Sequence, residues 1–173
     1  MSDCCEVPET LGGDRTACPR CEQRGKKVPL TAVQANATAD ALRAGIPTAP
    51  RFCETLECPV VYFDSESERV IEQALVTIPT LAKNTEDDSV LACHCFGYSR
   101  AAIRRAIELS PDSPVSKEIA AEVQAGHCAC EVRNPKGTCC LGDVIAIERA
   151  SLAARSLEHE EEIDANQAPA CHC

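Results

Sequence analysis

The sequence is poor in aromatic residues and in bulky apolar side chains. Of its 173 residues, three are Phe, two are Tyr, one is Met and none is Trp. Much of the 45% hydrophobic content is Ala and Cys, which bury little surface each. At about 25 cal/mol per Å² of buried apolar surface, the expected core is thin for this length. Domains with a thin core commonly rely on metal ions, because metal-binding energy contributes directly to folding.

Positive charge is scarce as well. The chain has 17 Lys and Arg against 27 Asp and Glu, which gives a net charge of −10 and a pI near 4.9. An acidic surface repels phosphate backbones, so we expect no nucleic-acid partner. The sequence also lacks a Ser/His/Asp arrangement and a phosphate-binding loop, so we expect no enzymatic activity.

Targeting and membrane signals are missing too. The N-terminal sequence MSDCCEVPETLGG has neither the basic region nor the apolar stretch of a secretory signal. No apolar run approaches the roughly 18 residues that a membrane span requires. We therefore expect a cytoplasmic protein with no membrane span, in a compartment where thiols stay reduced and structural disulfides are rare.

Cysteine, by contrast, is abundant. The chain has 14 cysteines, and all of them come in close pairs. The pairs are Cys4/Cys5, Cys18/Cys21, Cys53/Cys58, Cys93/Cys95, Cys128/Cys130, Cys139/Cys140 and Cys171/Cys173. Paired thiols in a reducing compartment predict ligands of metal ions or iron–sulfur clusters.

The first set of cysteines predicts a zinc site. Cys18 and Cys21 lie on one tight turn, and Cys53 and Cys58 precede an expected strand at residues 60–63. Two chelating pairs that meet across a small β unit form a closed, structural S4 site with Zn–S bonds of about 2.3 Å. Basic residues lie near enough in sequence to offset its charge: Lys26, Lys27 and Arg51.

Alternatives to this zinc site remain open. The thiols can be free and buried, or an Asp, Glu or His can replace one thiolate. The spacing does not separate zinc from iron, since tetrahedral sulfur sites serve both.

The second set predicts an iron–sulfur site. Cys93 and Cys95 precede a helix that Ser99 can cap, and residues 130–144, CEVRNPKGTCCLGDV, end at another helix start. Helix N-termini offer free N–H groups and partial positive charge, which stabilise the anionic sulfurs. Four thiolates on loops between helices form a usual cradle for [2Fe–2S]. Residues 134–137, Asn-Pro-Lys-Gly, predict a tight turn that returns the chain to Cys139 or Cys140, only one of which ligates.

A second zinc site is the alternative here, because S4 coordination serves both centres. Cys128 is a further candidate ligand in place of Cys130. His94 between two ligands suggests a Rieske-type site, but no second Cys–His pair has suitable spacing. We interpret His94 as a solvated residue or one that supports the ligands.

We predict an α+β fold: a small zinc-stapled β unit followed by a helical [2Fe–2S]-binding module, with flexible Cys-bearing tails. A short helix is expected within residues 31–50, and residues 69–78 can return as the hairpin partner of strand 60–63. The second half predicts helices from Ser99, from Ser113 and after Cys140. The predicted parts are residues 1–16 (flexible tail), 17–81 (zinc-binding β-rich unit), 82–90 (linker), 91–157 (helical [2Fe–2S] module) and 158–173 (acidic, Cys-rich tail).

These motifs together resemble a known family. The sequence CPRC…GKKV…RFCETLECPVVYF…CHCFGYSRAAIRRAIE…CEVRNPKGTCCLGDV is similar to the zinc- and [2Fe–2S]-containing N-terminal domain of CopZ-type copper chaperones, over about residues 17–150. The second half also resembles bacterioferritin-associated ferredoxin, a small helical [2Fe–2S] protein. The resemblance implies zinc on Cys18, Cys21, Cys53 and Cys58. It implies a cluster on Cys93, Cys95, Cys130 and Cys140, with Cys139 as the substitute for the last.

The resemblance and the spare thiols imply two candidate functions. The first is a metallochaperone that binds, reduces and hands over a soft metal such as copper (Cu+) to a metal-accepting or redox partner protein. Four thiols in the expected tails, Cys4, Cys5, Cys171 and Cys173, are candidate soft-metal ligands. The alternative is a ferredoxin-like electron carrier or iron–sulfur partner protein without metal delivery. It is favoured because this chain has no Met-x-Cys-x-x-Cys copper loop.

Overall fold

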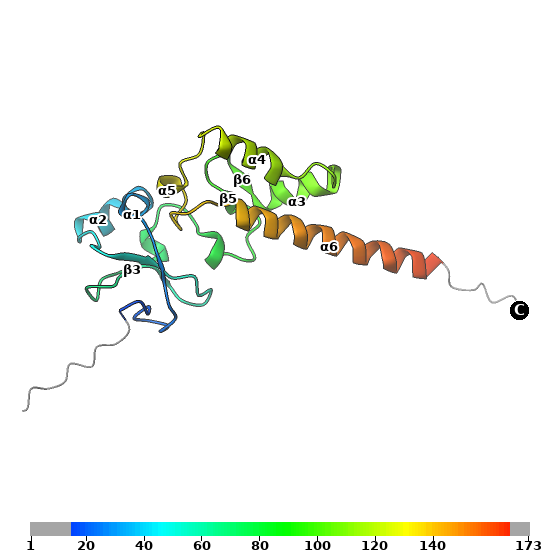
Figure 1. Ribbon diagram of the computed structural model, residues 1–173. Coiled ribbons are helices and arrows are strands. Elements are labelled where there is room, and N and C mark those ends of the chain that lie inside the picture. The colour runs from blue at the N-terminus through cyan, green and yellow to red at the C-terminus, as the bar shows by residue number, and fades with distance from the viewer. Residues whose placement is uncertain (1–14, 167–173) are drawn as a thin grey trace, which may run out of the picture.

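The computed structural model describes residues 15–166, with side chains through Leu157. The predicted α+β fold is confirmed: a small antiparallel sheet comes first and helices dominate afterwards (Figure 1). The elements in chain order are β1 Lys26–Lys27, α1 Leu30–Asn36, α2 Ala39–Arg43, β2 Pro50–Phe52, β3 Val60–Asp64, β4 Val70–Glu72, the 3₁₀ turns η1 Gln73–Leu75 and η2 Leu81–Lys83, β5 Leu91–Cys93, β6 Tyr98–Ser99, α3 Arg100–Leu109, α4 Val115–Gln124, α5 Cys130–Arg133 and α6 Leu141–Asn166.

The first half is built on four antiparallel strands in the order β1-β2-β3-β4. The β-branched and aromatic run of β3 is buried along its whole length, as expected for the central part of a sheet. The predicted hairpin is confirmed, since Phe63 pairs with Val70, although β4 covers only the first part of residues 69–78. Beyond Glu72 the chain turns into η1.

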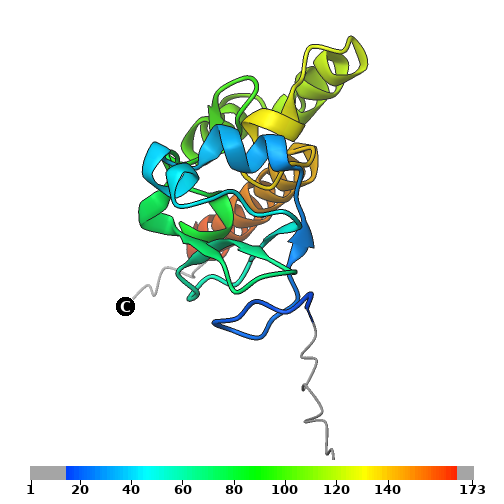
Figure 2. The same cartoon turned by 90° about the vertical axis from the view of Figure 1, so that its left-hand side faces the viewer.

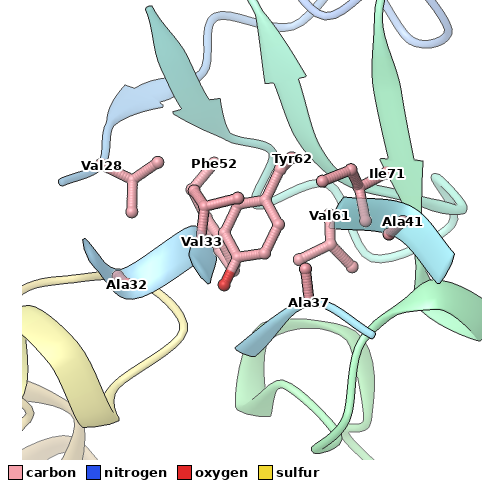
Figure 3. Close-up of a cluster of buried hydrophobic side chains, with 9 residues drawn as sticks. All are labelled: Val28, Ala32, Val33, Ala37, Ala41, Phe52, Val61, Tyr62 and Ile71. Carbon is pink, nitrogen blue, oxygen red and sulfur yellow. The ribbon is translucent and has the colours of Figure 1, made fainter. Parts of the chain in front are cut away.

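The helix predicted within residues 31–50 is divided into two. Ala37 is extended and ends α1, and Thr38 begins α2 by accepting a hydrogen bond from the Ala41 N–H. A Thr side chain at this position satisfies one of the free N–H groups of a new helix, so the chain can change direction there. Both helices cover one face of the sheet (Figure 3).

The core between sheet and helices depends on few large side chains. Phe52 and Tyr62 pack edge to face, with ring centroids 5.9 Å apart and an interplanar angle of 65°. Figure 3 shows Tyr62 among Val33 and Val61, with its hydroxyl oxygen directed away from the strands. The rest of this cluster is aliphatic and mostly small, which agrees with the thin core expected from the composition.

The second half is a β5–β6 hairpin followed by helices, and the predicted helices are confirmed. Ser99 caps α3 by accepting from the Ala102 N–H. At its start α6 packs against α3 and α4, where Val144 is fully buried. Glu148 is buried on the same helix and accepts a hydrogen bond from the Ser116 N–H at the start of α4.

The helix α6 continues to Asn166, into the segment that the sequence assigned to an acidic tail (Figure 1). Near its start Val144 is fully buried, whereas Leu152, two turns further on, is 37% exposed. The far part of α6 therefore projects from the body of the protein. Across residues 15–166, none of the helices combines the length and apolarity that a bilayer crossing needs.

The two halves pack directly against each other (Figure 2). Helix α1 of the first half lies against α5 of the second, and Asn36 donates a hydrogen bond to the Val132 carbonyl at 3.0 Å. The buried Arg100 holds the polar stretch 82–90 between the two halves in place. Its guanidinium donates hydrogen bonds to the carbonyls of Asn84, Thr85 and Asp87. The cysteine-bearing regions of both halves are thus parts of one packed structure.

Candidate metal centres

The first cysteine set lies at one edge of the four-stranded sheet. Cys18 and Cys21 lie on a turn before β1, Cys53 directly follows β2, and Cys58 precedes β3. Because β2 and β3 are antiparallel, the end of one and the start of the other lie at the same edge. The turn is closed by a hydrogen bond from the Cys18 N–H to the Gln23 carbonyl at 2.8 Å.

The four sulfur atoms are close enough to bind a single ion. They all lie within 4.8 Å of one another, with Cys18–Cys58 at 3.8 Å and Cys21–Cys53 at 3.6 Å. A tetrahedral ion with bonds of about 2.3 Å to sulfur places its ligands about 3.8 Å apart. The donor set therefore fits Zn²⁺ in a closed site whose coordination positions are all taken by protein.

The electrostatics of this set favour a bound cation. Burial raises the pKa of Cys58 to about 12. Burial would raise the pKa of Cys21 as well, but the Thr55 hydroxyl, 3.3 Å from its sulfur, and the Gln23 N–H outweigh it and lower that pKa to about 6. Thiolates this close repel one another, so a divalent ion is needed before all four deprotonate together.

A lysine that the sequence did not indicate, Lys83, donates hydrogen bonds to backbone carbonyls of this site. Lys83 is buried, and its ammonium donates to the carbonyls of Thr55 at 2.7 Å and Cys58 at 3.0 Å. It lies far along the chain from the cysteines and comes from η2, so no local spacing signals it. Of the basic residues named from the sequence, Lys26 instead pairs with Glu54 at 2.8 Å, and the Arg51 guanidinium donates to the Gly25 carbonyl.

The second cysteine set has a different geometry. The sulfurs of Cys95 and Cys130 lie 3.7 Å apart. The buried thiols of Cys93 and Cys140 lie near enough to shift each other's pKa, which is lowered for Cys93 and raised for Cys140. Unlike the four sulfurs of the first set, these four do not all lie within 4.8 Å of one another. Within residues 15–157, the cysteines whose sulfurs are that close together are those of the first set. In a [2Fe–2S] cluster each iron takes two protein thiolates, so two close sulfur pairs fit its ligand pattern.

Local backbone groups point at these sulfurs. The Ala129 N–H donates to the Cys95 sulfur at 3.3 Å. Burial raises the pKa of Cys130 to about 12, and the Cys140 N–H opposes that rise. The Cys140 thiol, with nearby backbone N–H groups, lowers the pKa of Cys93 to about 6 despite its burial. Such N–H donors stabilise thiolates, whether free or bound to iron.

Burial separates the alternative ligands in this region. Cys130 and Cys140 are buried, whereas Cys139 is exposed and Cys128 is half-buried. Cys130 is the residue whose sulfur lies 3.7 Å from that of Cys95, and Cys140 is the residue whose thiol lowers the pKa of Cys93. The two remaining thiols flank the set without belonging to either sulfur pair.

The predicted turn at residues 134–137 is present. The Gly137 N–H donates to the Asn134 carbonyl at 2.7 Å, and the Asn134 side chain accepts from the Lys136 N–H and donates to the Thr138 carbonyl. Gly137 has φ +64° and lies against Pro29, where an added Cβ would come within 2.3 Å of the proline Cδ. Glycine is required there by both conformation and space.

His94 is half-buried, and its Nδ1 atom is not solvated. Among residues 15–157, this nitrogen and the Thr80 hydroxyl are buried without a hydrogen-bond partner, and both residues line a cavity of about 10 Å³. A cavity of that size between two polar groups suits one water molecule. Burial lowers the pKa of His94, with Asp143 opposing it, which keeps the ring neutral.

Comparisons with known proteins agree with the first centre. Residues 15–77 match the family zf_CopZ, described as a zinc binding domain. The fold is similar to the crystal structure of the Archaeoglobus fulgidus CopZ N-terminal domain, with a TM-score of 0.59 and 23% identity. That similarity covers 72% of this chain and 91% of the other, so it extends beyond residues 15–77 into the second half. The search of curated proteins gave no match.

The four tail cysteines named as soft-metal ligands lie outside the described residues. They are Cys4, Cys5, Cys171 and Cys173. Their involvement stays a prediction from the sequence.

Proposed function

We propose that the protein is a zinc-stabilised [2Fe–2S] metallochaperone, which binds a soft metal ion such as copper and hands it to a partner protein. The observation that carries this proposal is the contrast between the two cysteine sets. One is a compact group of four sulfurs for a single ion, and the other is split into two close pairs. The family match of residues 15–77 and the CopZ-like fold support the zinc-binding half and its assignment to metal handling.

The residues of the second set divide the task of holding a cluster. Cys95 and Cys130 would hold one iron, Cys93 and Cys140 the other, and the backbone N–H groups of Ala129 and Cys140 stabilise the sulfurs. When bound, the cluster supplies a one-electron couple that would reduce Cu²⁺ to Cu⁺ with an electron from an external donor. The role is binding and transfer in the reducing cytoplasm, without enzymatic turnover.

The cargo requires thiols that neither centre uses. Exposed Cys139 and half-buried Cys128 lie beside the second set, where a soft ion can take two or three thiolates. The tail cysteines are further candidates from the sequence. Ligand exchange among exposed thiols is the way such an ion would pass to a partner.

Copper titration tests the proposal. Protein with both centres loaded is titrated with Cu⁺ under anaerobic conditions against a coloured Cu⁺ chelator. The variant Cys139→Ser, which lacks the exposed thiol beside the second set, is titrated in parallel. We expect the protein to compete for Cu⁺ and the variant to compete less well. If neither protein competes while the iron centre is reduced and reoxidised reversibly, the ferredoxin-like electron carrier is the correct function instead.

A further inference from the structure

The Lys136 side chain connects the two cysteine sets, because it forms ion pairs with a residue next to each of them. The Lys136 ammonium lies 3.5 Å from the Glu54 carboxylate and 3.1 Å from both carboxylate oxygens of Asp143. Glu54 directly follows the first-set ligand Cys53. Asp143 is on the first turn of α6, three residues after the second-set ligand Cys140.

The position of Lys136 makes its ion pairs more than surface contacts. Its side chain is only 20% exposed, whereas Lys26, the other partner of Glu54, is 64% exposed. Solvent screens the Lys26 pair strongly and the Lys136 pairs much less. The contact with both oxygens of Asp143 also fixes the ammonium in one place.

The loop that carries Lys136 is held on the first half from several sides. The Tyr62 hydroxyl donates to the Pro135 carbonyl at 2.9 Å in the buried core. Gly137 lies against Pro29, where there is no room for a Cβ. Residues 134–137 therefore cannot shift without disturbing the sheet unit, and they set the path from Cys130 to Cys140.

We propose that Lys136 is a positioning residue that transmits occupancy of the Cys18/Cys21/Cys53/Cys58 site to the placement of Cys140. With an ion bound, Cys53 is fixed, and Glu54 then holds Lys136 and through it Asp143 at the start of α6. Without the ion, Cys53 and Glu54 are released, and α6 loses one of its attachments to the first half. The inference rests on the proposed metal sites, but its main test does not require a cluster.

Thiol protection measures this coupling. Cluster-free full-length protein is prepared with zinc and after zinc removal by a chelator, and the alkylation rate of Cys140 is followed by mass spectrometry. We expect zinc removal to speed alkylation about fivefold or more, the lower end of typical coupling between sites. In Lys136→Gln the rate should already be high with zinc bound and change less than about twofold on removal.

Two controls separate positioning from general stability. Lys26→Gln removes the other Glu54 ion pair and should behave as the native protein, and Lys136→Arg should restore coupling because it keeps the charge and a bidentate contact. If Lys136→Gln does not fold, Glu54→Gln and Asp143→Asn break the two arms of the link separately. If zinc removal speeds Cys140 alkylation in Lys136→Gln as much as in the native protein, the proposal is overturned. The same holds if both Glu54→Gln and Asp143→Asn respond to zinc removal as the native protein does.

A second readout uses the loaded protein. Zinc removal should change the visible circular dichroism of the iron centre in the native chain but not in Lys136→Gln. If no iron centre forms in any variant, the proposed function fails, while the alkylation rates still decide the role of Lys136.

Discussion

The hydrogen bond from the Tyr62 hydroxyl to the Pro135 carbonyl joins the two halves, and a single substitution that removes the hydroxyl oxygen tests its contribution to stability. Tyr62 is fully buried, and its hydroxyl donates to the Pro135 carbonyl at 2.9 Å. Burial raises the pKa of the phenol, so it stays protonated and remains a donor. The change Tyr62→Phe removes this hydroxyl and leaves the ring packed against Phe52.

The expected cost follows from the acceptor that is left behind. A buried carbonyl without a donor costs about 1–3 kcal/mol, more than the net worth of an ordinary hydrogen bond. For a chain of this size, each kcal/mol corresponds to about 2–4 °C in the melting temperature. We therefore expect Tyr62→Phe to lose about 1–3 kcal/mol and to melt several degrees lower.

Urea unfolding under anaerobic conditions, with metal loading matched, measures this cost. The control is Tyr98→Phe, which removes an exposed hydroxyl that donates to Glu118 at 3.1 Å and should cost less than about 0.5 kcal/mol. The m-value should be the same in both variants, since the surface exposed on unfolding is unchanged. Equal stability of the two variants would refute the account of how the halves are joined.

Three further predictions concern pH, a turn and a ligand. Burial would raise the pKa of Asp64, but hydrogen bonds from backbone N–H groups outweigh it and lower the pKa to about 2. Asp64→Asn should therefore reduce the free energy of unfolding by up to about 2 kcal/mol at pH 7. This difference from the native protein should shrink as pH falls from about 4 to 2, as urea titrations at pH 7 and pH 3 would show. Gly137→Ala should cost more than Gly126→Ala in thermal melts, because both have positive φ but only the first meets a neighbouring side chain. Cys95→Ser should lose iron and keep zinc in metal analysis; equal loss of both metals would mean that the two sets are not separate centres.

Local signals in the sequence predicted local structure well. The β-branched run of β3, the Ser99 cap of α3 and the turn at residues 134–137 each depend on residues within a few positions of one another. The break between α1 and α2 was missed, because Thr38 reads as a tolerated helix residue until its capping hydrogen bond is seen.

The long-range contacts around the two cysteine sets could not be predicted, since they join residues distant in sequence. Nothing around Lys83 indicates that it reaches the Cys58 carbonyl, and nothing around Lys136 indicates Glu54. The pairing of sulfurs in the second set also depends on tertiary structure, because burial distinguishes Cys140 from Cys139 and adjacent positions look alike in sequence.

Metal and sulfide analysis of anaerobically purified protein tests the central claim most directly, combined with EPR before and after dithionite. The two cysteine sets predict about two iron, two sulfide and one zinc per chain, with an S = 1/2 signal that appears on reduction. Colourless protein with zinc alone and no EPR signal after reduction would contradict the claim that the second set holds a [2Fe–2S] cluster.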